Sequence, residues 1–587
     1  TATHHSSLVL SLRVDIPPCS CRPSHRILFS SAPTMPRSAL SRHFFSLRAS
    51  TFQATKLRRP LSTAAKTNDS LSFEASAPPA RPFPSLTISK NGLEANGTFA
   101  ESQLAFLRPD PGEITEMDAA LKRANMGVVS HYYMDPELQG VLFSSAWPHV
   151  VTSDSLAMGD AAVKMVREGG VESIACLGVD FMAESVRAML DNAGYPHVPV
   201  YRLAEKDIGC SLAESAERPA YYAWLRKAQA TPKSLHVVYI NTSLVTKAES
   251  QALVPTITCT SSNVVNTILT AYDQVPGLTV WYGPDTYMGE NLRTLFETLS
   301  EMPDEVVAQV HPNHSQKTLK ALLPRLQVFQ EGNCVVHHMF GSKVADQVRR
   351  DYAEAFVTAH LEVPGEMFAV ANEAAASGRG VVGSTSNILD FIMAKTKEAL
   401  SSAPASGSPP KKKLAFVLGT EAGMITPIVR AVQALLLSAN SGGSSSDLEV
   451  EVVFPVAAEA VAPQPGEDPA GGLAVVPGAA GAEGCSAAGG CATCPFMKMN
   501  SLEALVDLAD KVSAAASVDG GERSAKSASK PSPAFPPLLE GFLPKRRGAL
   551  VGGKPASELG SVPILNMRDL TNTKKISDVL VADILAR

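Results

Sequence analysis

Short apolar runs alternate with amphipathic stretches between residues 113 and 400. Residues 237–240 form a compact run of β-branched and aromatic residues, as in a buried strand, whereas 156–166 and 264–272 repeat apolar residues at helical spacing. Parallel strands need a crossover connection, usually a helix, so this alternation predicts α/β layers with mainly parallel strands.

One pattern of apolar and hydroxyl residues recurs. An apolar run meets a Ser/Thr cluster, and a helix-like run follows, at 150–155 (VVTSDS), 258–263 (TCTSSN) and 381–387 (VVGSTSN). The interval is too long for a solenoid repeat and suits three related α/β domains. Each cluster alone could simply cap the helix behind it. Three such clusters together favour a shared site for phosphate or carboxylate, because helix N-termini hold anions.

Composition shifts predict the organisation of the chain. Residues 1–68 carry ten basic residues, one acid and many Ser, a pattern typical of a plastid or mitochondrial transit peptide. The alternative is an unstructured tail that carries no targeting signal. A Pro/Ser-rich lead-in follows at 69–112. We expect α/β domains at 113–205, 206–300 and 301–400. Residues 401–587 then complete the fold and contain Gly/Ala/Pro/Ser-rich inserts.

Charge and cysteine content narrow the function. Fifty-two Lys and Arg against 57 Asp and Glu give a net charge of −5, which argues against a nucleic-acid binder held by phosphate contacts. No uninterrupted apolar stretch reaches about 18 residues, so the sequence predicts no membrane span. Nine cysteines are too few for a disulfide scaffold, and the odd number leaves one unpaired. The cysteine content therefore favours intracellular metal or redox chemistry.

Cys485, Cys491 and Cys494 lie in a Gly-rich stretch, and no second Cys or His pair follows them. A zinc finger is therefore excluded, and a metal bound there must take ligands from upstream. The upstream thiols are Cys176, Cys210, Cys259 and Cys334. Cys176 lies within an apolar run and is expected in the core. Cys210 and Cys334 lie on turns, where both could reach a shared centre.

Three histidines accompany these thiols. His131, His337 and His360 each end an apolar run that is expected to be a strand. Parallel sheets place active sites at the carboxyl ends of their strands, so the three imidazoles are expected to converge.

Several motifs occur in order along the chain, including HYYMDPELQG from 131, GCSLAES from 209, VVYINTS from 237, CVVHHMFG from 334, AHLEVPGE from 359, GVVGSTSNILDF from 380 and CATCPFMKMNSL from 491. Together they resemble the quinolinate synthase family, and the leader resembles that of its plastid members. The resemblance implies an α/β fold of three pseudo-threefold-related three-layer α/β/α domains, with parallel sheets around a central active site. It also implies a plastid (chloroplast) stroma location, with the mitochondrion as alternative.

The resemblance implies a [4Fe-4S] cluster held by Cys210, Cys334 and Cys494, with one open iron acting as a Lewis acid. Cys485 and Cys491 then form a redox-sensitive pair near the cluster or merely flank it. Bacterial members commonly read His-Pro-Glu-Cys where this chain reads His-Leu-Glu-Val from residue 360. That position therefore supplies no thiol here.

The implied reaction condenses iminoaspartate with dihydroxyacetone phosphate to quinolinate, releasing phosphate and two waters, in de novo NAD biosynthesis. The implied catalytic residues are His131, Tyr133, Tyr239, His360 and Glu362. The implied substrate-binding residues are Ser155, Asn241, Ser261, His337, Ser384, Thr385 and Met497. Expected partners are aspartate oxidase and iron–sulfur assembly factors, and the expected assembly is a homodimer, with neither nucleic acid nor membrane involved.

Two rival interpretations remain at this point. One is another iron–sulfur hydro-lyase acting on a different small di-acid, which needs no triose phosphate site. The other is a non-catalytic zinc or redox protein that uses Cys485, Cys491 and Cys494 alone.

Overall fold

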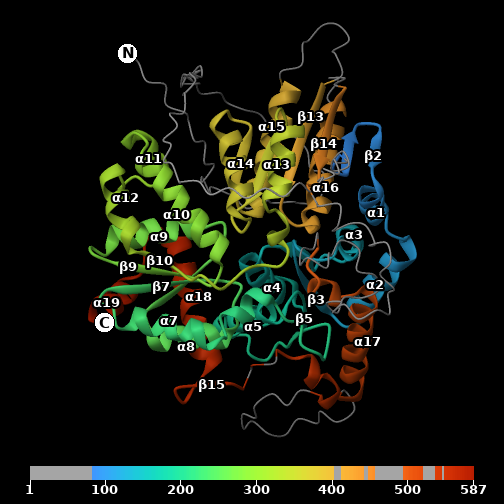
Figure 1. Ribbon diagram of the computed structural model, residues 1–587. Helices are drawn as coiled ribbons and strands as arrows, with labels where there is room; N and C mark the ends of the chain where they lie inside the picture. The colour runs from blue at the N-terminus through green and yellow to red at the C-terminus, as the bar shows by residue number, and fades with distance from the viewer. Residues whose placement is uncertain are drawn as a thin grey trace, which may run out of the picture.

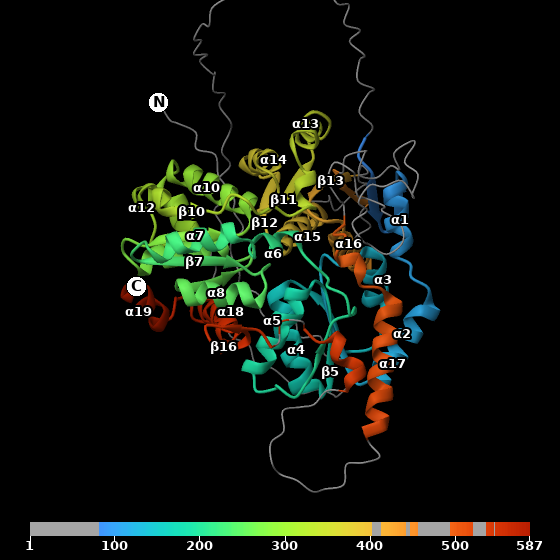
Figure 2. The same cartoon turned by 60° about the horizontal axis from the view of Figure 1, so that its bottom comes forward.

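The computed structural model describes residues 82–401, 412–441, 447–455, 493–519, 536–544, 546 and 548–587. The expected transit peptide, together with Cys485 and Cys491, lies outside the described residues. Three sheets, each flanked by helices, meet near the middle of the molecule (Figures 1 and 2). The α/β class and the parallel sheets expected from the sequence are confirmed.

The first sheet has four parallel strands in the order β4-β3-β5-β6. These are β3 (Met126–His131), β4 (Val150–Ser153), β5 (Ser173–Leu177) and β6 (Val200–Tyr201). Its helices are α2 (Pro111–Arg123), α3 (Pro136–Ser144), α4 (Ser155–Gly169) and α5 (Asp180–Asn192). Asp154 caps α4 by accepting hydrogen bonds from two backbone N–H groups, and left-handed Gly170 ends that helix. The recurring Ser/Thr cluster thus begins a helix, as expected.

The second sheet has the order β10-β9-β7-β8 and is also parallel. Its strands are β7 (Ser234–Tyr239), β8 (Thr256–Cys259), β9 (Thr279–Gly283) and β10 (Leu326–Val328). Its helices are α6 (Ser211–Ser215), α7 (Pro219–Gln229), α8 (Leu244–Leu253), α9 (Val264–Gln274), α10 (Thr286–Ser300), α11 (Asp304–Val310), α12 (Gln316–Leu322) and the 3-10 helix η1 (Leu323–Arg325).

The third sheet has six strands in the order β12-β11-β13-β14-β1-β2. The parallel part consists of β11 (Phe356–His360), β12 (Gly380–Gly383), β13 (Lys412–Gly419) and β14 (Leu448–Val453). The hairpin of β1 (Ser85–Ser89) and β2 (Gly92–Asn96) joins β14 in antiparallel fashion. The helices are α1 (Thr98–Phe106), α13 (Ser342–Asp351), α14 (Gly365–Ala376), α15 (Thr385–Ser401), α16 (Ile425–Ser441) and the 3-10 turns η2 (His337–Met339) and η3 (Ala422–Met424).

The parallel strands of the three sheets share one topology. In each set of four, the first strand in sequence is central, the second lies on one side of it, and the third and fourth lie in turn on the other side. This common order supports the pseudo-threefold arrangement implied by the family resemblance. It also makes β3, β7 and β11 equivalent, so that their carboxyl ends correspond to one another.

The C-terminal segment packs against the first two domains. Helix α17 (Leu502–Asp519) lies beside α2, whereas α18 (Ala556–Thr573) packs on α8 and β8. The guanidinium of Arg202 donates to the carbonyls of Gly541 and Leu543, at 3.0 and 3.2 Å, and so fixes the 3-10 helix η6 (Pro537–Phe542) to the first domain. The remaining elements are η5 (Met497–Met499), β15 (Leu550–Val551), β16 (Lys554–Pro555) and α19 (Asp578–Ala586).

The sheets divide the chain at other points than the sequence suggested. Strand β10 belongs to the second sheet, so that domain passes residue 300 and ends beyond 328. Strands β13 and β14 come from the C-terminal segment and complete the third sheet, and the lead-in contributes β1 and β2 to it. The physical reason is that alternating patterns locate strands but do not reveal which sheet each strand joins.

One helix in the described part of the chain is long and apolar enough to cross a membrane. Residues Ala422–Ala439 have a mean hydropathy of 1.5, and 56% of this stretch is buried inside the protein. Its apolar face, including Ile428, Val429 and Val432, lies in the core of the third domain. Packing inside the fold therefore accounts for its composition.

Candidate active site and metal centre

The central strands end in polar residues that occupy matching positions. His131 pairs with Ser153, Tyr239 with Cys259, and His360 with Gly383, each pair at the carboxyl end of two parallel strands. Active sites of parallel α/β sheets lie at this end. The common topology therefore directs one ionisable or hydroxyl side chain from each domain toward a shared centre.

Aromatic and imidazole rings from different domains contact one another there. Tyr133 lies 4.9 Å from His131, 5.9 Å from His337 and 6.1 Å from His360, measured between ring centroids. The rings of His337 and His360 are stacked at 5.0 Å. The convergence expected of the three histidines is thus present in the structure. The position of His337 differs from expectation, because it begins the 3-10 turn η2 instead of ending a strand.

Glu362 joins residues of separate domains. Its Oε2 lies 2.9 Å from Nδ1 of His337, both side chains being almost fully buried. The hydroxyl of Tyr239, at the end of β7, donates a hydrogen bond to the same carboxylate. Glu362 is therefore held between a second-domain phenol and an imidazole.

Burial and neighbouring groups set the charge of this cluster. Burial works to raise the pKa of Glu362, but His337, His360 and the hydroxyl of Tyr239 together lower it to about 2. Burial lowers the pKa of His360 to about 3 and that of His131 to about 4. Near pH 7 Glu362 is therefore ionised, and His131 and His360 are neutral.

Hydrogen bonds to Nδ1 fix the tautomers of the neutral imidazoles of His131 and His360. Nδ1 of His131 accepts a hydrogen bond from the backbone N–H of Tyr133 at 3.0 Å, and Nδ1 of His360 accepts from that of Glu362 at 3.3 Å. An accepting Nδ1 carries no proton, so each proton lies on Nε2. Both histidines consequently offer an Nε2–H donor.

Two further buried acids lie near Glu362, and sequence reasoning missed both. Burial and the charge of Glu362 raise the pKa of Glu421 and of Asp285 well above their usual values. Within the described residues, Oε2 of Glu421 and Oδ2 of Asp285 are buried without a hydrogen-bond partner. A signal existed, because both acids come directly after apolar strand-like runs, at 412–419 and 279–283.

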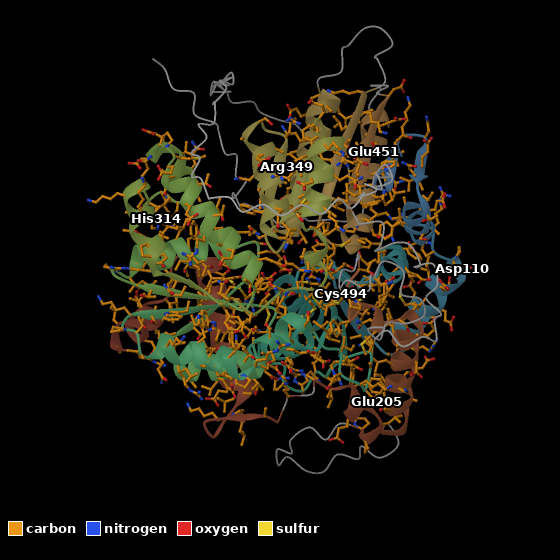
Figure 3. All side chains as sticks on the ribbon, in the orientation of Figure 1. Asp110, Glu205, His314, Arg349, Glu451 and Cys494 are labelled. Carbon is orange, nitrogen blue, oxygen red and sulfur yellow. The ribbon has the colours of Figure 1, made fainter. Side chains whose placement is uncertain are left out.

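Cys210, Cys334 and Cys494 have equivalent places in the three domains. Each follows the fourth strand of its sheet, namely β6, β10 and β14. The carbonyl of each accepts a backbone hydrogen bond from the residue four positions later, at 2.9, 3.1 and 3.2 Å. Figure 3 labels Cys494, which lies toward the middle of the molecule where the domains meet.

The local geometry of these thiols suits a metal centre. Burial raises the pKa of each thiol, and hydrogen bonding by backbone N–H groups two or three residues later acts to lower it: Leu212 and Ala213 at Cys210, His337 at Cys334, and Phe496 and Met497 at Cys494. Such hydrogen bonds stabilise thiolate ligands and tune iron–sulfur sites. The three thiols are also electrostatically linked, because Cys494 raises the pKa of Cys334 and Cys210 raises that of Cys494. The donor set therefore fits a thiolate-bound metal group.

Two overlapping sets of side chains in the described residues have spacing suitable for a metal ion. Cys334, His337 and Glu421 form one, and His337, His360 and Glu362 the other, with ligand atoms within 4.8 Å of one another in each. The two sets share His337, so the thiols and the histidine–carboxylate cluster adjoin. Cys176 and Cys259, by contrast, are buried within β5 and β8, as expected for Cys176.

The expected substrate-binding residues follow the strands beside the central ones. Ser155 begins α4 and Thr385 begins α15, whereas Ser261 precedes α9. The clusters of the second and third domains fold alike, because Asn263 Oδ1 accepts from the backbone N–H of Thr260 at 2.8 Å and Asn387 Oδ1 from that of Ser384 at 2.9 Å.

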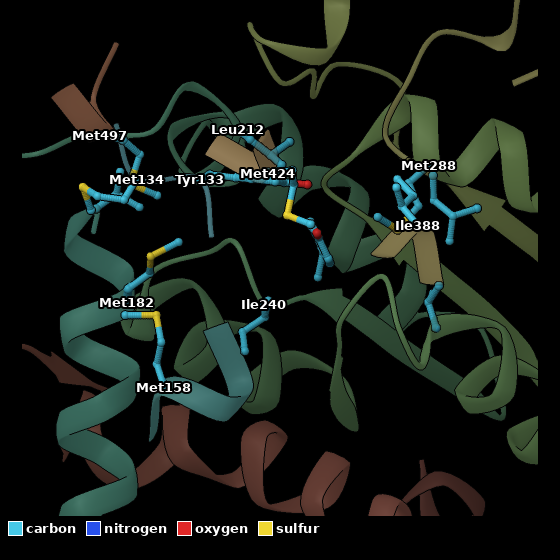
Figure 4. Close-up of a cluster of buried hydrophobic side chains, with 14 of the residues drawn as sticks. Tyr133, Met134, Met158, Met182, Leu212, Ile240, Met288, Ile388, Met424 and Met497 are labelled. Atoms are coloured by element: carbon cyan, nitrogen blue, oxygen red, sulfur yellow. The ribbon is translucent and has the colours of Figure 1, made fainter. Parts of the chain in front are cut away.

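Met497 and Asn241 complete the set of expected residues. Met497 is buried with Met134 and Tyr133 of the first domain, in an apolar cluster that Leu212 and Met424 extend (Figure 4). Asn241 follows β7 and is partly exposed. Two hydrogen bonds of 3.3 Å between Asn500 and Gly178 bind the Cys494 segment to the end of β5.

The arrangement defines a class of protein. Three thiols and a buried acid–base cluster at the joined carboxyl ends of three parallel sheets are the parts of an α/β/α metal-dependent enzyme.

The family model of the quinolinate synthetase A protein matches residues 115–434. The chain is 48% identical over 525 residues to the chloroplastic quinolinate synthase of Oryza sativa, covering 86% of this chain and 70% of that protein. It is 47% identical over 522 residues to the chloroplastic enzyme of Arabidopsis thaliana, with 87% and 68% covered. It is 26% identical over 312 residues to quinolinate synthase of the bacterium Rippkaea orientalis, with 53% and 71% covered. The chain therefore belongs to the quinolinate synthase family, whose members are enzymes of NAD biosynthesis.

Proposed function

We propose that this protein condenses iminoaspartate with dihydroxyacetone phosphate to give quinolinate, with release of phosphate and two waters, in the plastid stroma. The observation that carries the proposal is the placement of Cys210, Cys334 and Cys494 beside the buried Glu362 cluster. Each of these cysteines follows the fourth parallel strand of one sheet. The basic, Ser-rich leader and the chloroplastic names of the plant relatives support the location. Aspartate oxidase as imine supplier, iron–sulfur assembly factors and a homodimer belong to the same proposal.

Cys210, Cys334 and Cys494 would hold a [4Fe-4S] cluster. When bound with one iron free of protein ligands, such a cluster supplies a Lewis acid for the departure of a hydroxyl group. Three thiols with backbone N–H donors at sulfur support this assignment over a site built from nitrogen and oxygen ligands.

Ionised Glu362 is the group best suited to accept a proton in the enol–keto steps. Its pKa of about 2 makes it a weak base, so binding a substrate that displaces His337 or the hydroxyl of Tyr239 would strengthen it. His131 and His360 would donate from Nε2–H to substrate oxygens. Tyr133, whose pKa burial and nearby carboxylates raise well above its usual value, stays a neutral donor.

The three Ser/Thr clusters would bind the anionic groups of the substrates. Ser155, Ser261, Ser384 and Thr385 stand at or near the starts of α4, α9 and α15, where free N–H groups and the helix dipole favour phosphate and carboxylate. Asn241 would hydrogen-bond a substrate oxygen beside Tyr239.

Anaerobic purification followed by iron and sulfide analysis and a quinolinate assay tests the proposal. Four irons per chain and quinolinate formed only when both substrates are present would support it. Iron without quinolinate, but with dehydration of another di-acid, would favour a different iron–sulfur hydro-lyase. A colourless protein that retains metal after Cys210→Ser would point to a zinc or redox protein.

A further inference from the structure

Gln139 donates hydrogen bonds to the backbone on both sides of Tyr133. From α3, its Nε2 donates to the carbonyl of Tyr132 at 2.7 Å and to that of Met134 at 2.9 Å. The side chain of Gln139 is completely buried. The loop after β3 has no strand partner for these carbonyls, so the amide fixes the turn from which the Tyr133 ring projects.

Lys247 does the same for Asn241 in the second domain. From α8, its Nζ donates to the carbonyl of Ile240 at 2.9 Å and to that of Thr242 at 2.5 Å. Lys247 is also completely buried, although lysine is seldom so placed. Its position six residues after Asn241 matches that of Gln139 after Tyr133.

Asn291 supplies the third case from a different element. From α10 of the second domain, its Nδ2 donates to the carbonyl of Leu361 at 2.9 Å and to that of Val363 at 2.7 Å, on either side of Glu362. Its side chain is 2% exposed. The residue six positions after Glu362 is Phe368, which offers no donor, so the neighbouring domain provides the amide instead.

Two of these side chains also join domains directly. Asn291 connects α10 of the second domain to the third. Nε2 of Gln139 also lies 2.9 Å from the carbonyl oxygen of Gly423 in η3 of the third domain, so one of its two N–H groups is shared between two carbonyls. A Cβ atom at position 423 would overlap the carbonyl oxygen of Tyr132, so glycine is needed for this close approach.

Lys247 lies at the remaining boundary, between the first and second domains. Glu184 on α5 of the first domain accepts a hydrogen bond from the backbone N–H of Leu244 at 2.7 Å, at the start of the helix that carries Lys247. The ammonium also lies 6.0 Å from the ring centre of Phe181 on α5. Each domain boundary thus contains one buried donor that grips the backbone around one proposed functional residue.

We propose that Gln139, Lys247 and Asn291 are positioning residues, hereafter the carbonyl clamps, which hold Tyr133, Asn241 and Glu362 in register across the three domain boundaries. This inference rests on the proposed function, since those three residues are its proposed catalytic and binding groups. The clamps touch neither substrate nor metal; they act through the backbone, where a displacement of about 1 Å can cost 100-fold in rate.

Substitutions of similar size that remove the donors test the clamps: Gln139→Met, Lys247→Met and Asn291→Leu. The matched control is Gln274→Met, because Gln274 also joins two segments through its amide, to the backbone of Ile576 at 3.1 and 2.7 Å, but lies away from the site. Iron content, absorption near 400 nm, melting temperature, kcat and KM are measured for each variant.

The clamp variants are expected to keep four irons and the wild-type absorption while quinolinate formation falls at least about 10-fold. Asn291→Leu should lower kcat, and Lys247→Met should mainly raise KM, because Asn241 binds substrate. Lys247→Arg, which keeps the donors, should recover part of the loss. Gln274→Met should leave turnover unchanged even if its melting temperature falls. Added to Glu362→Gln, Asn291→Leu should cause no further loss, because it acts through Glu362.

Wild-type kinetics in the three variants would contradict the proposal. So would a loss of turnover that simply follows a loss of iron, or one that follows a fall in melting temperature like that of Gln274→Met. Where Asn291→Leu does not fold, Asn291→Asp keeps the size and removes at least one of the two donated hydrogen bonds, because a carboxyl group has at most one O–H, and normal kcat in it is equally contradictory. A wild-type protein that binds iron but makes no quinolinate refutes the proposed function instead, so the two failures are distinguishable.

Discussion

The thiol end and the histidine–carboxylate end of the site are built in different ways. Cys210, Cys334 and Cys494 come from three equivalent turns, and each relies on its own local backbone for hydrogen bonds to sulfur. Glu362 and its neighbours instead hold one another through direct contacts across domains. The thiol end is three ligands that come from three separate turns, whereas the other end is a network of side chains in direct contact.

This difference predicts different responses to substitution. A centre held by three thiolates needs all of them at once, so losing any one should act in an all-or-none manner. A connected network of hydrogen bonds and charges redistributes when one member changes, so the metal group should survive while turnover falls. Variants at the two ends therefore test whether the distinction is real.

The largest effect is expected at the thiol end. Cys210→Ser, Cys334→Ser and Cys494→Ser should each abolish the cluster and activity, because a serine hydroxyl is a poor substitute for a thiolate at iron. Iron and sulfide analysis of anaerobically purified protein measures the cluster, and quinolinate formation measures activity.

The matched control at that end is Cys176→Ala, which removes a thiol buried in β5. It should keep four irons per chain and near wild-type activity. Retention of a full cluster in any one of the three serine variants would reject that residue as a ligand. A graded loss through the series would erase the contrast between the two ends.

The next largest effect is expected at Glu362. Glu362→Gln keeps the shape of the side chain and removes the charge that His337 and His360 stabilise. The cluster should remain, and kcat should fall by about 100-fold or more, in the range usual for loss of a general acid–base group. Absorption near 400 nm and steady-state kinetics on the same sample measure the two quantities. Near-normal rates would remove Glu362 from the mechanism. Loss of iron would show that the thiol end and the histidine–carboxylate end do not respond independently to substitution.

Sequence reasoning reached the repeated parts of the site more easily than the parts made by contact between domains. The Ser/Thr clusters at 150–155, 258–263 and 381–387 were visible as a repeat, and the sheets give them equivalent positions. Motif resemblance supplied Cys210, Cys334 and Cys494. Reasoning from the residues alone expected Cys176 in the core and gave Cys210 and Cys334 only as turn residues that could reach a shared centre, because spacing along a chain does not measure distance in a fold.

The residues that sequence reasoning missed act across boundaries that only the packed structure defines. Asn291 lies 71 residues before Glu362, and no local pattern connects an amide on one helix with carbonyls in another domain. The raised pKa of Glu421 depends on burial and on the charge of Glu362, which are properties of the assembled site. The domain boundaries were misplaced for a similar reason, since strand pairing is a long-range property.

A buried histidine outside the site sharpens the comparison further. The charge of Glu362 acts on His131 and His360. His236 on β7 is completely buried instead, and its Nε2 lies 2.8 Å from the hydroxyl of Tyr221. Its ring packs near Trp224. Burial alone lowers the pKa of His236 to about 3. His236 should therefore affect stability rather than catalysis.

The smallest predicted effect is a pH dependence of folding due to His236. Between its unfolded pKa of 6.5 and its folded pKa of about 3, the unfolded chain binds one more proton, so the stability that neutral His236 contributes above pH 6.5 is lost as pH falls. At pH 5.5 the loss is about 1.4 kcal/mol. Urea unfolding of the wild-type protein and His236→Phe at pH 7.5 and 5.5, both anaerobic, measures it as the difference between their pH effects, which cancels the other titrating groups. An equal pH effect in both proteins would show that His236 is not held neutral by burial.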